Sequence, residues 1–371
     1  MSQNGPTVGD IVDAIGASAP WHWAADWDQV GLLAGDPEAV AKHVLVTLDP
    51  SAQVVARAVE RGVDVIVSHH PAFIEPPRRL VSGMRGPGGV VSMALRSGIS
   101  LIAAHTNLDR HPEAASSLAR MVGLTPGPVL ERASMSRSVV VAYVPAEAAD
   151  TVRDAMSKAG AGIVGTYTQC SFNHTGEGRF TAGRGSHPVR GSSGENVINE
   201  MRIEMTCPTA IAAHVLNAAR DAHPYETPVI LACDAQVARV DCGLGRVCEV
   251  EPTALSKLSR DVAGRVKVAP RVWGDPERMV SRVGVATGSA GSLIGDALAA
   301  DVDVLIGGEV RYHDAMDASD AGLSIIELGH DVSEWPLVPL LGSLVARTPG
   351  LPADSIDIDP PSIRWWTALL R

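Results

Sequence analysis

The sequence has few cysteines, and their pattern disfavours a thiolate site. The five cysteines are odd in number and form no C-x-x-C motif. A disulfide framework and a zinc site built on thiolates are therefore both disfavoured. We expect a reduced, cytoplasmic protein. The cysteines are Cys170, Cys207, Cys233, Cys242 and Cys248.

A surplus of positive charge is also missing. The chain has 31 lysines and arginines against 42 aspartates and glutamates, which gives a net charge of -11. This balance argues against a broad nucleic-acid surface or an anionic-membrane surface. No apolar run approaches the roughly 18 residues of a membrane span. The N-terminus has no basic region followed by an apolar one, so we predict no signal peptide.

The two ends of the 371-residue chain instead show short apolar runs that alternate with amphipathic segments. This alternation predicts an α/β fold with a mostly parallel sheet, helices on both faces, formed by the N- and C-terminal segments together. Two separate domains remain the alternative. The predicted strands are 43–49, 63–68, 99–104, 280–287, 302–308 and 323–329, and the predicted helices are 50–62, 90–98, 291–300, 311–322 and 334–346.

The middle of the chain has a different pattern. Strand, helix and strand are predicted over 138–145, 146–160 and 161–172, and again over 201–208, 209–223 and 227–234. This duplication suggests an inserted ferredoxin-like α+β domain at 130–244, which leaves 1–129 and 245–371 as a discontinuous first domain. The glycine- and arginine-rich stretch 176–195 is predicted to be a long loop between the two units.

Histidines stand where three of the apolar strands end. His69 and His70 follow strand 63–68, His105 follows strand 99–104, and His330 follows strand 323–329. Sites in open α/β sheets form beyond the carboxyl ends of the strands. Asp109 lies four residues after His105, and Glu334 lies four residues after His330. A spacing of four places both side chains on one helical face, so the sequence predicts a set of nitrogen and oxygen ligands for zinc, manganese or iron.

Each of these residues also has an ordinary structural interpretation. A histidine at a strand end is commonly a hydrogen-bonded loop residue. Glu334 could interact with the N-terminus of its helix, and Asp109 could cap the next helix. The metal hypothesis is favoured because three strand ends supply ligand-type residues together.

The adjacent pair His69–His70 suggests two ions instead of one. Neighbouring residues in an extended segment point in opposite directions, so they chelate a single ion poorly. They suit two ions about 3.5–4 Å apart, bridged by Asp109 or Glu334.

Several motifs resemble those of the Nif-three-like family, whose members are often named GTP cyclohydrolase I type 2 homologues. The metal motifs are "SHHP" (68–71), "AAHTNLD" (103–109) and "GHDVSE" (329–334). "WDQVGLLAGDP" (27–37) resembles the N-terminal signature, and "GGEVRYHDAMDA" (307–318) a glycine–glutamate–histidine segment. "GTYTQCSFNHTGEGRF" (165–180) and "AHPYETPV" (222–229) resemble an optional CutA-like or PII-like insert.

The resemblance implies that two divalent metal ions are bound by His69, His70, Asp109, His330 and Glu334. It makes His105 a further ligand or a residue beside the ligands, and it places Glu309 and His313 on the wall of the site. For Glu309 and His313, strand-end packing and a helix surface are the alternatives. The resemblance also implies a toroidal homohexamer with the metal sites facing an internal cavity.

Two functions of different class follow. The first is a metal-dependent hydrolase that acts on a nucleotide; the family name implies attack at C8 of the guanine of GTP, with release of formate. The second is a metal-binding scaffold or ligand-sensing protein without catalysis. The sequence leaves open the metal, the substrate, the ligand of the insert and the role of Trp365 and Trp366.

Overall fold

The computed structural model describes residues 5–81, 83–131, 137–164, 167–235 and 242–361. The chain divides into two compact units. We call residues 1–132 with 240–371 the core unit and residues 133–239 the insert unit. The expected insert, 130–244, differs from this division by a few residues at each end. Trp365 and Trp366 lie outside the described residues.

The core unit contains two five-stranded sheets. In the first sheet the strand order is β1-β4-β3-β2-β14, with β4, β3, β2 and β14 parallel and β1 antiparallel at the edge. Alternate residues of β2 face opposite layers. Val44 and Val46 pack under α1 and α12, whereas Leu45 packs under α2 and α3. Helices on both faces explain why these strands are apolar throughout. The elements are β1 (Gly31–Ala34), β2 (Val44–Thr47), β3 (Val65–Ser68), β4 (Ser100–Ala103), β14 (Ile356–Ile358), α1 (Val8–Ser18), α2 (Ala52–Arg61), α3 (Pro87–Arg96) and α12 (Leu337–Val345).

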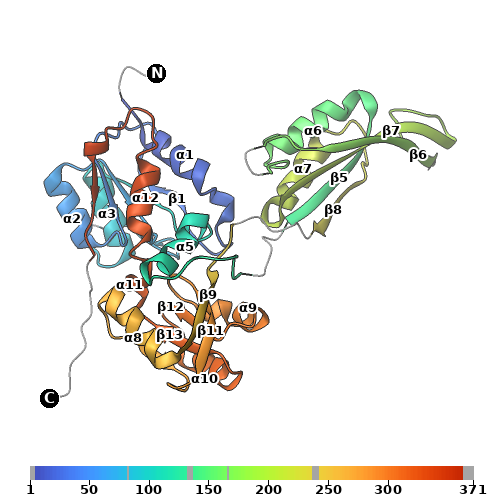
Figure 1. Ribbon diagram of the computed structural model, residues 1–371. Coiled ribbons are helices and arrows are strands. Elements are labelled where there is room, and N and C mark those ends of the chain that lie inside the picture. Colours follow the sequence, from blue (N-terminus) through green and yellow to red (C-terminus); the bar gives the residue numbers. More distant parts are fainter. Residues whose placement is uncertain (1–4, 82, 132–136, 165–166, 236–241, 362–371) are drawn as a thin grey trace, which may run out of the picture. The chain divides into compact units, whose positions relative to one another are not determined.

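The second sheet has the order β10-β13-β12-β11-β9. Its three central strands are parallel, and both edge strands are antiparallel to their neighbours. One face packs on α5 and α8, and the other packs on α9 and α10. The elements are β9 (Arg246–Ala254), β10 (Arg271–Trp273), β11 (Met279–Val285), β12 (Val304–Gly307), β13 (Ser324–Glu327), α5 (Pro112–Met121), α8 (Leu255–Val266), α9 (Ile294–Ala299) and α10 (Tyr312–Asp320). Figure 1 labels most of them.

The expectation of one sheet shared by both ends of the chain is therefore wrong in its detail, although the α/β class is confirmed. Antiparallel edge strands, β1 in the first sheet and β9 and β10 in the second, occupy edges along which a parallel sheet could have continued. The C-terminal segment also returns to the first sheet, where β14 pairs with β2 and α12 packs on it. The three-residue strand β14 was too short to be predicted from its sequence.

The insert unit has the ferredoxin-like order β-α-β-β-α-β, with an antiparallel sheet ordered β6-β7-β5-β8. Its core lies between this sheet and the helices α6 and α7 (Figure 1). The elements are β5 (Arg137–Pro145), α6 (Ala149–Lys158), β6 (Phe172–Ala182), β7 (Gly194–Pro208), α7 (Ala212–Ala222) and β8 (Ile230–Ala235).

Two local predictions for the insert unit are wrong in part. Among the described residues of the strand expected at 161–172, only Phe172 lies in a strand, as the first residue of β6, and Val164 and Tyr167 form an isolated bridge. Of the loop expected at 176–195, residues 183–193 are the connecting loop of a hairpin, whereas 176–182 and 194–195 belong to its strands, which pair from Phe172–Glu204 to Ala182–Gly194. Most of β6 is exposed to solvent. Its polar, glycine-rich sequence therefore gave no sign of a strand whose pairing depends on backbone hydrogen bonds.

No helix among the described residues is long and apolar enough to cross a membrane.

Candidate metal centre

The first sheet brings four of the predicted residues to one end. His69 and His70 follow β3, and His105 follows the adjacent parallel strand β4. Asp109 is the last residue of the single-turn helix α4 (Thr106–Asp109) that begins directly after His105. The rings of His69 and His105 lie 5.2 Å apart, and Asp109 Oδ1 lies 3.6 Å from His69 Nε2. Neighbouring strand ends therefore bring these side chains together.

The second sheet supplies the other two. His330 and Glu334 begin and end the short helix α11 (His330–Glu334), which follows β13. Glu334 Oε1 lies 3.0 Å from His330 Nε2, and Glu334 Oε2 lies 2.9 Å from His70 Nε2. The rings of His70 and His330 are 5.3 Å apart. The carboxyl ends of both sheets thus converge on one cluster, in which Glu334 contacts imidazoles from each sheet.

Two groups of possible ligand atoms overlap within this cluster. One group is His69, His70 and His105, and the other is His70, His330 and Glu334. Within each group the ligand atoms lie within 4.8 Å of one another. His70 belongs to both groups, and each group could hold a metal ion.

The four imidazoles share one hydrogen-bonding arrangement. Each Nδ1 faces an oxygen acceptor, so each Nδ1 carries the proton and each Nε2 remains to bind a cation. The pairs are His69 with the Ala104 carbonyl at 2.9 Å, His70 with Asp49 at 2.8 Å, His105 with Asp28 at 2.8 Å, and His330 with Glu309 at 3.1 Å.

One buried atom tests whether a metal fits. His69 is fully buried, and its Nε2 has no hydrogen-bond partner in the part of the chain that the structure describes. An unpaired buried nitrogen is costly unless another group engages it. His69 Nε2 lies 3.6 Å from Asp109 and 3.7 Å from Glu334, separations that leave room for a bridging cation. Imidazole nitrogens and carboxylate oxygens are suitable ligands for zinc, manganese or iron, so the residues fit such an ion.

The electrostatics of the cluster also favour positive charge. Burial by itself would raise the pKa of Glu334, but interactions with His330, His69 and His70 hold that pKa well below its usual range. Burial lowers the pKa of His70, but hydrogen bonds to Asp49 and Glu334 outweigh it and raise this pKa to about 10. The hydrogen bond to Glu334 raises the pKa of His330 to about 9. In the absence of a metal ion, protons occupy the imidazole nitrogens, and they compete with a metal ion for these positions.

Asp109 differs from Glu334, because burial raises its pKa and the nearby imidazoles do not outweigh that effect. Its Oδ1 accepts a 3.4 Å hydrogen bond from the hydroxyl of Thr287. A cation beside Asp109 would favour its ionised form.

A glycine makes room for Glu334. Gly288 has φ +61°, and a Cβ placed there would lie 2.3 Å from Glu334 Oε1. Its backbone N–H donates to Ser333 Oγ at 2.9 Å. Any larger residue at this position would push the carboxylate away from the imidazoles.

Sequence reasoning missed Asp28, Asp49 and Gly288. Asp28 is fully buried as a side chain and also accepts hydrogen bonds from the backbone and hydroxyl of Thr106. Burial raises its pKa, but the hydrogen bond to His105 and the other contacts outweigh this and lower it to about 2. Both aspartates had a signal: Asp28 lies in the motif 27–37, and Asp49 lies just beyond the carboxyl end of β2.

The two residues expected on the wall of the site behave differently. Glu309 joins the cluster through His330 and is largely exposed. His313 lies in α10 with its ring 5.3 Å from that of Tyr312. Among the described residues, no hydrogen bond, ion pair or ring contact connects His313 to the cluster, which favours the helix-surface interpretation for it.

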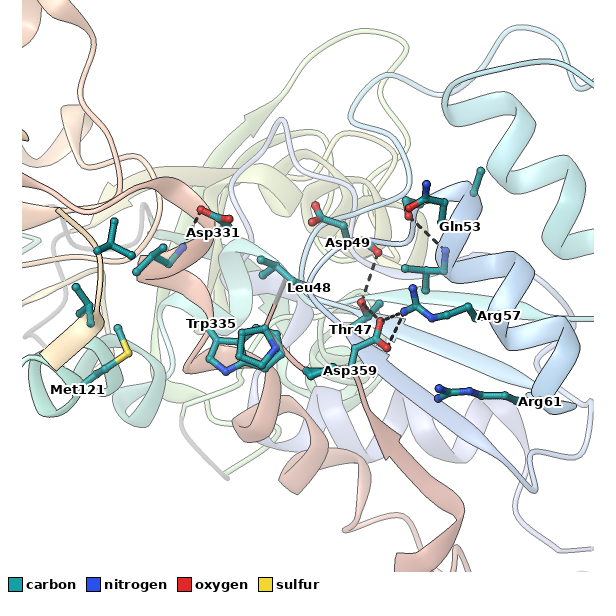
Figure 2. Close-up of a pocket in the computed structure, with 18 residues that line it drawn as sticks. Thr47, Leu48, Asp49, Gln53, Arg57, Arg61, Met121, Asp331, Trp335 and Asp359 are labelled. Atoms are coloured by element: carbon teal, nitrogen blue, oxygen red, sulfur yellow. Dashed lines mark hydrogen bonds and ion pairs between the residues drawn. The ribbon is translucent and has the colours of Figure 1, made fainter. Parts of the chain in front are cut away.

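A cavity of about 890 Å³ is drawn in Figure 2. Its lining includes Asp331 of α11 and Trp335 directly after that helix, whereas His330 and Glu334 of α11 belong to the cluster. Asp49 both lines the cavity and holds the ring of His70.

Known proteins resemble this chain along nearly its whole length. The sequence model of the family Duf34/NIF3 (NGG1p interacting factor 3) matches residues 6–358. A Mycobacterium tuberculosis protein named GTP cyclohydrolase 1 type 2 homolog is 35% identical over 345 residues, which cover 89% of this chain and 88% of that protein. A Bacillus subtilis protein of the same name is 31% identical over 325 residues, which cover 86% and 87%.

A solved structure agrees with these sequence relatives. The crystal structure of a Bacillus cereus protein related to NIF3 matches with a TM-score of 0.65 and 28% identity, covering 99% of this chain and 100% of that one. The family resemblance inferred from the three histidine motifs is thus confirmed. The chain belongs to the Duf34/NIF3 (NGG1p interacting factor 3) family.

Proposed function

We propose that the cluster binds two divalent metal ions and that the protein is a metal-dependent hydrolase. The proposed ligands are His69, His70, Asp109, His330 and Glu334, with His105 as a further ligand. The observation that carries the proposal is the pair of overlapping ligand groups. His70 has one free nitrogen, Nε2, and can serve only one ion, but Glu334 Oε1 lies 3.7 Å from His69 Nε2 and 3.0 Å from His330 Nε2 and could connect two ions. The two groups together contain the four imidazoles and Glu334, whereas a single ion would leave several imidazole nitrogens unused.

Solvent access supports catalysis over a closed structural site. The side chains of His330 and His70 are 35% and 22% exposed, so a substrate can approach the cluster from their side. Divalent ions bound here would supply Lewis-acid chemistry, which polarises a carbon or phosphorus centre and acidifies water. Glu309 is exposed beside His330 and is placed to accept a proton at this open edge.

A nucleotide is the proposed substrate, and GTP is the first to test. This part of the proposal comes from the name that the curated relatives carry, GTP cyclohydrolase 1 type 2 homolog. The experiment is to strip the purified protein with a chelator, restore zinc, manganese or ferrous iron separately, and follow GTP and other nucleotides by chromatography together with formate release.

The expected result is metal-dependent turnover that chelation abolishes and that Glu334→Gln eliminates. If fully loaded protein turns over no nucleotide or phosphoester but binds one of them tightly, the hydrolase proposal fails. A ligand-sensing or scaffold function then replaces it. That second candidate is favoured by a separate cavity within the insert unit.

The family resemblance also leads us to propose a toroidal homohexamer. Light scattering coupled to size-exclusion chromatography tests it directly: a mass of six chains is expected, and a monomer would refute it.

A further inference from the structure

The insert unit contains a cavity of about 470 Å³ that the metal chemistry does not use. Its walls come from β5, from the β6–β7 hairpin with its connecting loop, and from the turn between α7 and β8. A space of this size suits a small molecule. Every wall residue belongs to the insert unit, so ligand binding in this cavity does not depend on the proposed hydrolase function.

The turn that closes the cavity is built by a buried histidine. His223 Nε2 donates to the carbonyl of Tyr143 at 2.8 Å, and its Nδ1 accepts the backbone N–H of Tyr225 at 3.0 Å. The rings of His223 and Tyr225 pack edge to face at 4.9 Å. The segment 222–229 is therefore a defined structure that places Tyr225 and Glu226 in the cavity wall.

The connecting loop of the hairpin is also held in place. Asn196 Oδ1 accepts the backbone N–H of Ser192, and Asn196 Nδ2 donates to the carbonyls of Ser192 and Gly194. Glu226 Oε1 accepts the backbone N–H of His187 at 3.1 Å, which fixes the loop to the turn.

The charges lining the cavity are unbalanced. Arg179 pairs with Glu177 at 3.0 Å, and Arg190 pairs with Glu147 at 2.8 Å, so both arginines are neutralised locally. Among the described residues, neither Glu200 nor Glu226 has an ion-pair partner. The cavity therefore carries surplus negative charge.

Glu200 is held inside the cavity by its surroundings. A Cβ on Gly178 would lie 2.2 Å from Glu200 Oε2, so the carboxylate rests on bare backbone of the opposite strand. The Tyr225 hydroxyl is buried beside it and makes no hydrogen bond of normal geometry within the described chain. Burial, followed by the interaction with Glu200, raises the pKa of Tyr225 to about 12, so Tyr225 adds no charge of its own.

Three aromatic rings complete the wall: Tyr143, Phe180 and Tyr225. Aromatic faces attract cations, and carboxylates without a cationic partner strengthen that preference. We propose that this cavity binds a small organic cation whose ammonium or guanidinium group lies between Glu200 and Glu226, with its apolar part on these rings. An anionic ligand is disfavoured, because both lining arginines already have carboxylate partners.

Isothermal titration calorimetry on the full chain tests the proposal with agmatine and benzylamine as probes. Benzyl alcohol is the neutral match of benzylamine, and inorganic phosphate is the anionic control. Both amines should bind, and replacing the ammonium group by a hydroxyl should weaken binding at least tenfold. This comparison uses the unmodified protein and needs no variant to fold.

The variant arm uses Glu200→Gln with Glu226→Gln, expected to weaken amine binding at least tenfold. The control is Glu195→Gln, which removes one negative charge from the same strand as Glu200 but outside the cavity, and it should leave binding unchanged. Equal binding of benzylamine and benzyl alcohol, phosphate binding in place of amine binding, or amine binding that the double variant leaves intact would each overturn the proposal.

Discussion

The two sheets of the core unit deliver ligands to the same cluster but hold them differently. In the first sheet the Nδ1 atoms of His69, His70 and His105 meet the Ala104 carbonyl, Asp49 and Asp28, whose side chains are 35% exposed for Asp49 and fully buried for Asp28. In the second sheet the Nδ1 of His330 meets Glu309, whose side chain is 59% exposed.

This difference concerns preorganisation. A ring held by a buried or ordered acceptor keeps its orientation before a cation arrives, whereas a ring held by an exposed carboxylate can turn. The first sheet therefore presents a fixed half of the cluster, and α11 of the second sheet presents an adjustable half. An adjustable half at the open edge is compatible with substrate entry, and the predictions below test the contrast in order of expected effect.

Changing the pH should have the largest effect on metal affinity, because it changes the protonation of ligands in both halves of the cluster. The pKa of His70 is raised to about 10 and that of His330 to about 9, so both rings of the metal-free protein stay protonated between pH 6 and pH 8. A metal must displace both protons, so its affinity should rise by up to about 100-fold per pH unit over this range. Competition titrations with a chromophoric chelator measure it. An affinity that levels off near pH 7 would show that the rings titrate near the ordinary value of about 6.5.

Glu334→Gln should be the most damaging single substitution. Its carboxylate contacts His70 from the first sheet and His330 from the second, so both halves lose a charged partner. We expect metal affinity to fall by more than the roughly 10–100-fold typical of losing an outer hydrogen-bond partner. Metal content after dialysis and far-UV circular dichroism are the measurements.

The control for this substitution is Asp331→Asn, which removes a charge from the same helix at a residue that lines the cavity. It should change metal affinity only a few-fold. A folded Glu334→Gln protein that keeps its full metal content would show that the ligand assignment is wrong.

Asp49→Asn should have a smaller effect, about tenfold in metal affinity. The amide can still accept the proton of His70 Nδ1, but the negative charge that stabilises a cation bound to that ring is lost, and this loss outweighs the weaker competition from protons. Asp28→Asn should act similarly through His105. If neither substitution alters metal affinity, the first sheet does not hold its ligands in the way described here.

Glu309→Gln should reduce metal affinity only a few-fold, since its partner His330 lies in the adjustable half and its charge is screened by solvent. The contrast between the two sheets requires that Glu309→Gln loses less metal affinity than Asp49→Asn. Measuring both variants under the same conditions tests this, and an equal or larger loss in Glu309→Gln would show that the two sheets hold their ligands alike.

Removing the insert should have the smallest effect on metal affinity. The chain leaves and re-enters the core unit side by side: the backbone N–H groups of Leu130 and Glu131 donate to the carbonyls of Gly245 and Leu244 at 3.2 and 3.0 Å. Joining Glu131 to Gly243 through a short glycine–serine linker should therefore give a folded core whose metal affinity lies within about twofold of the full chain. A folded core that loses its metal would mean that the insert completes the site.

Much of the core unit could be predicted because its signals are local. Apolar runs such as 63–68 and 99–104 became the buried strands β3 and β4, since period and composition depend on neighbouring residues only. The ligand-type residues were found by the same means, because His69, His70, His105 and His330 follow strands directly. Strand β6 of the insert hairpin was missed because most of it is solvent-exposed and lacks an apolar pattern, whereas the buried residues of β7 lie within the predicted strand 201–208.

The sequence by itself determined the buried parallel strands β2, β3, β4, β11, β12 and β13 with several of their helices, the α/β class, the family motifs and the kind of ligand atom available. The tertiary structure alone decided that two sheets form, that their ends converge, and which acceptor holds each imidazole. Those acceptors are distant along the chain: Asp28 lies 77 residues from His105, and Asp49 lies 21 residues from His70. Pairings of this kind depend on how sheets and helices pack, which no window of neighbouring residues contains.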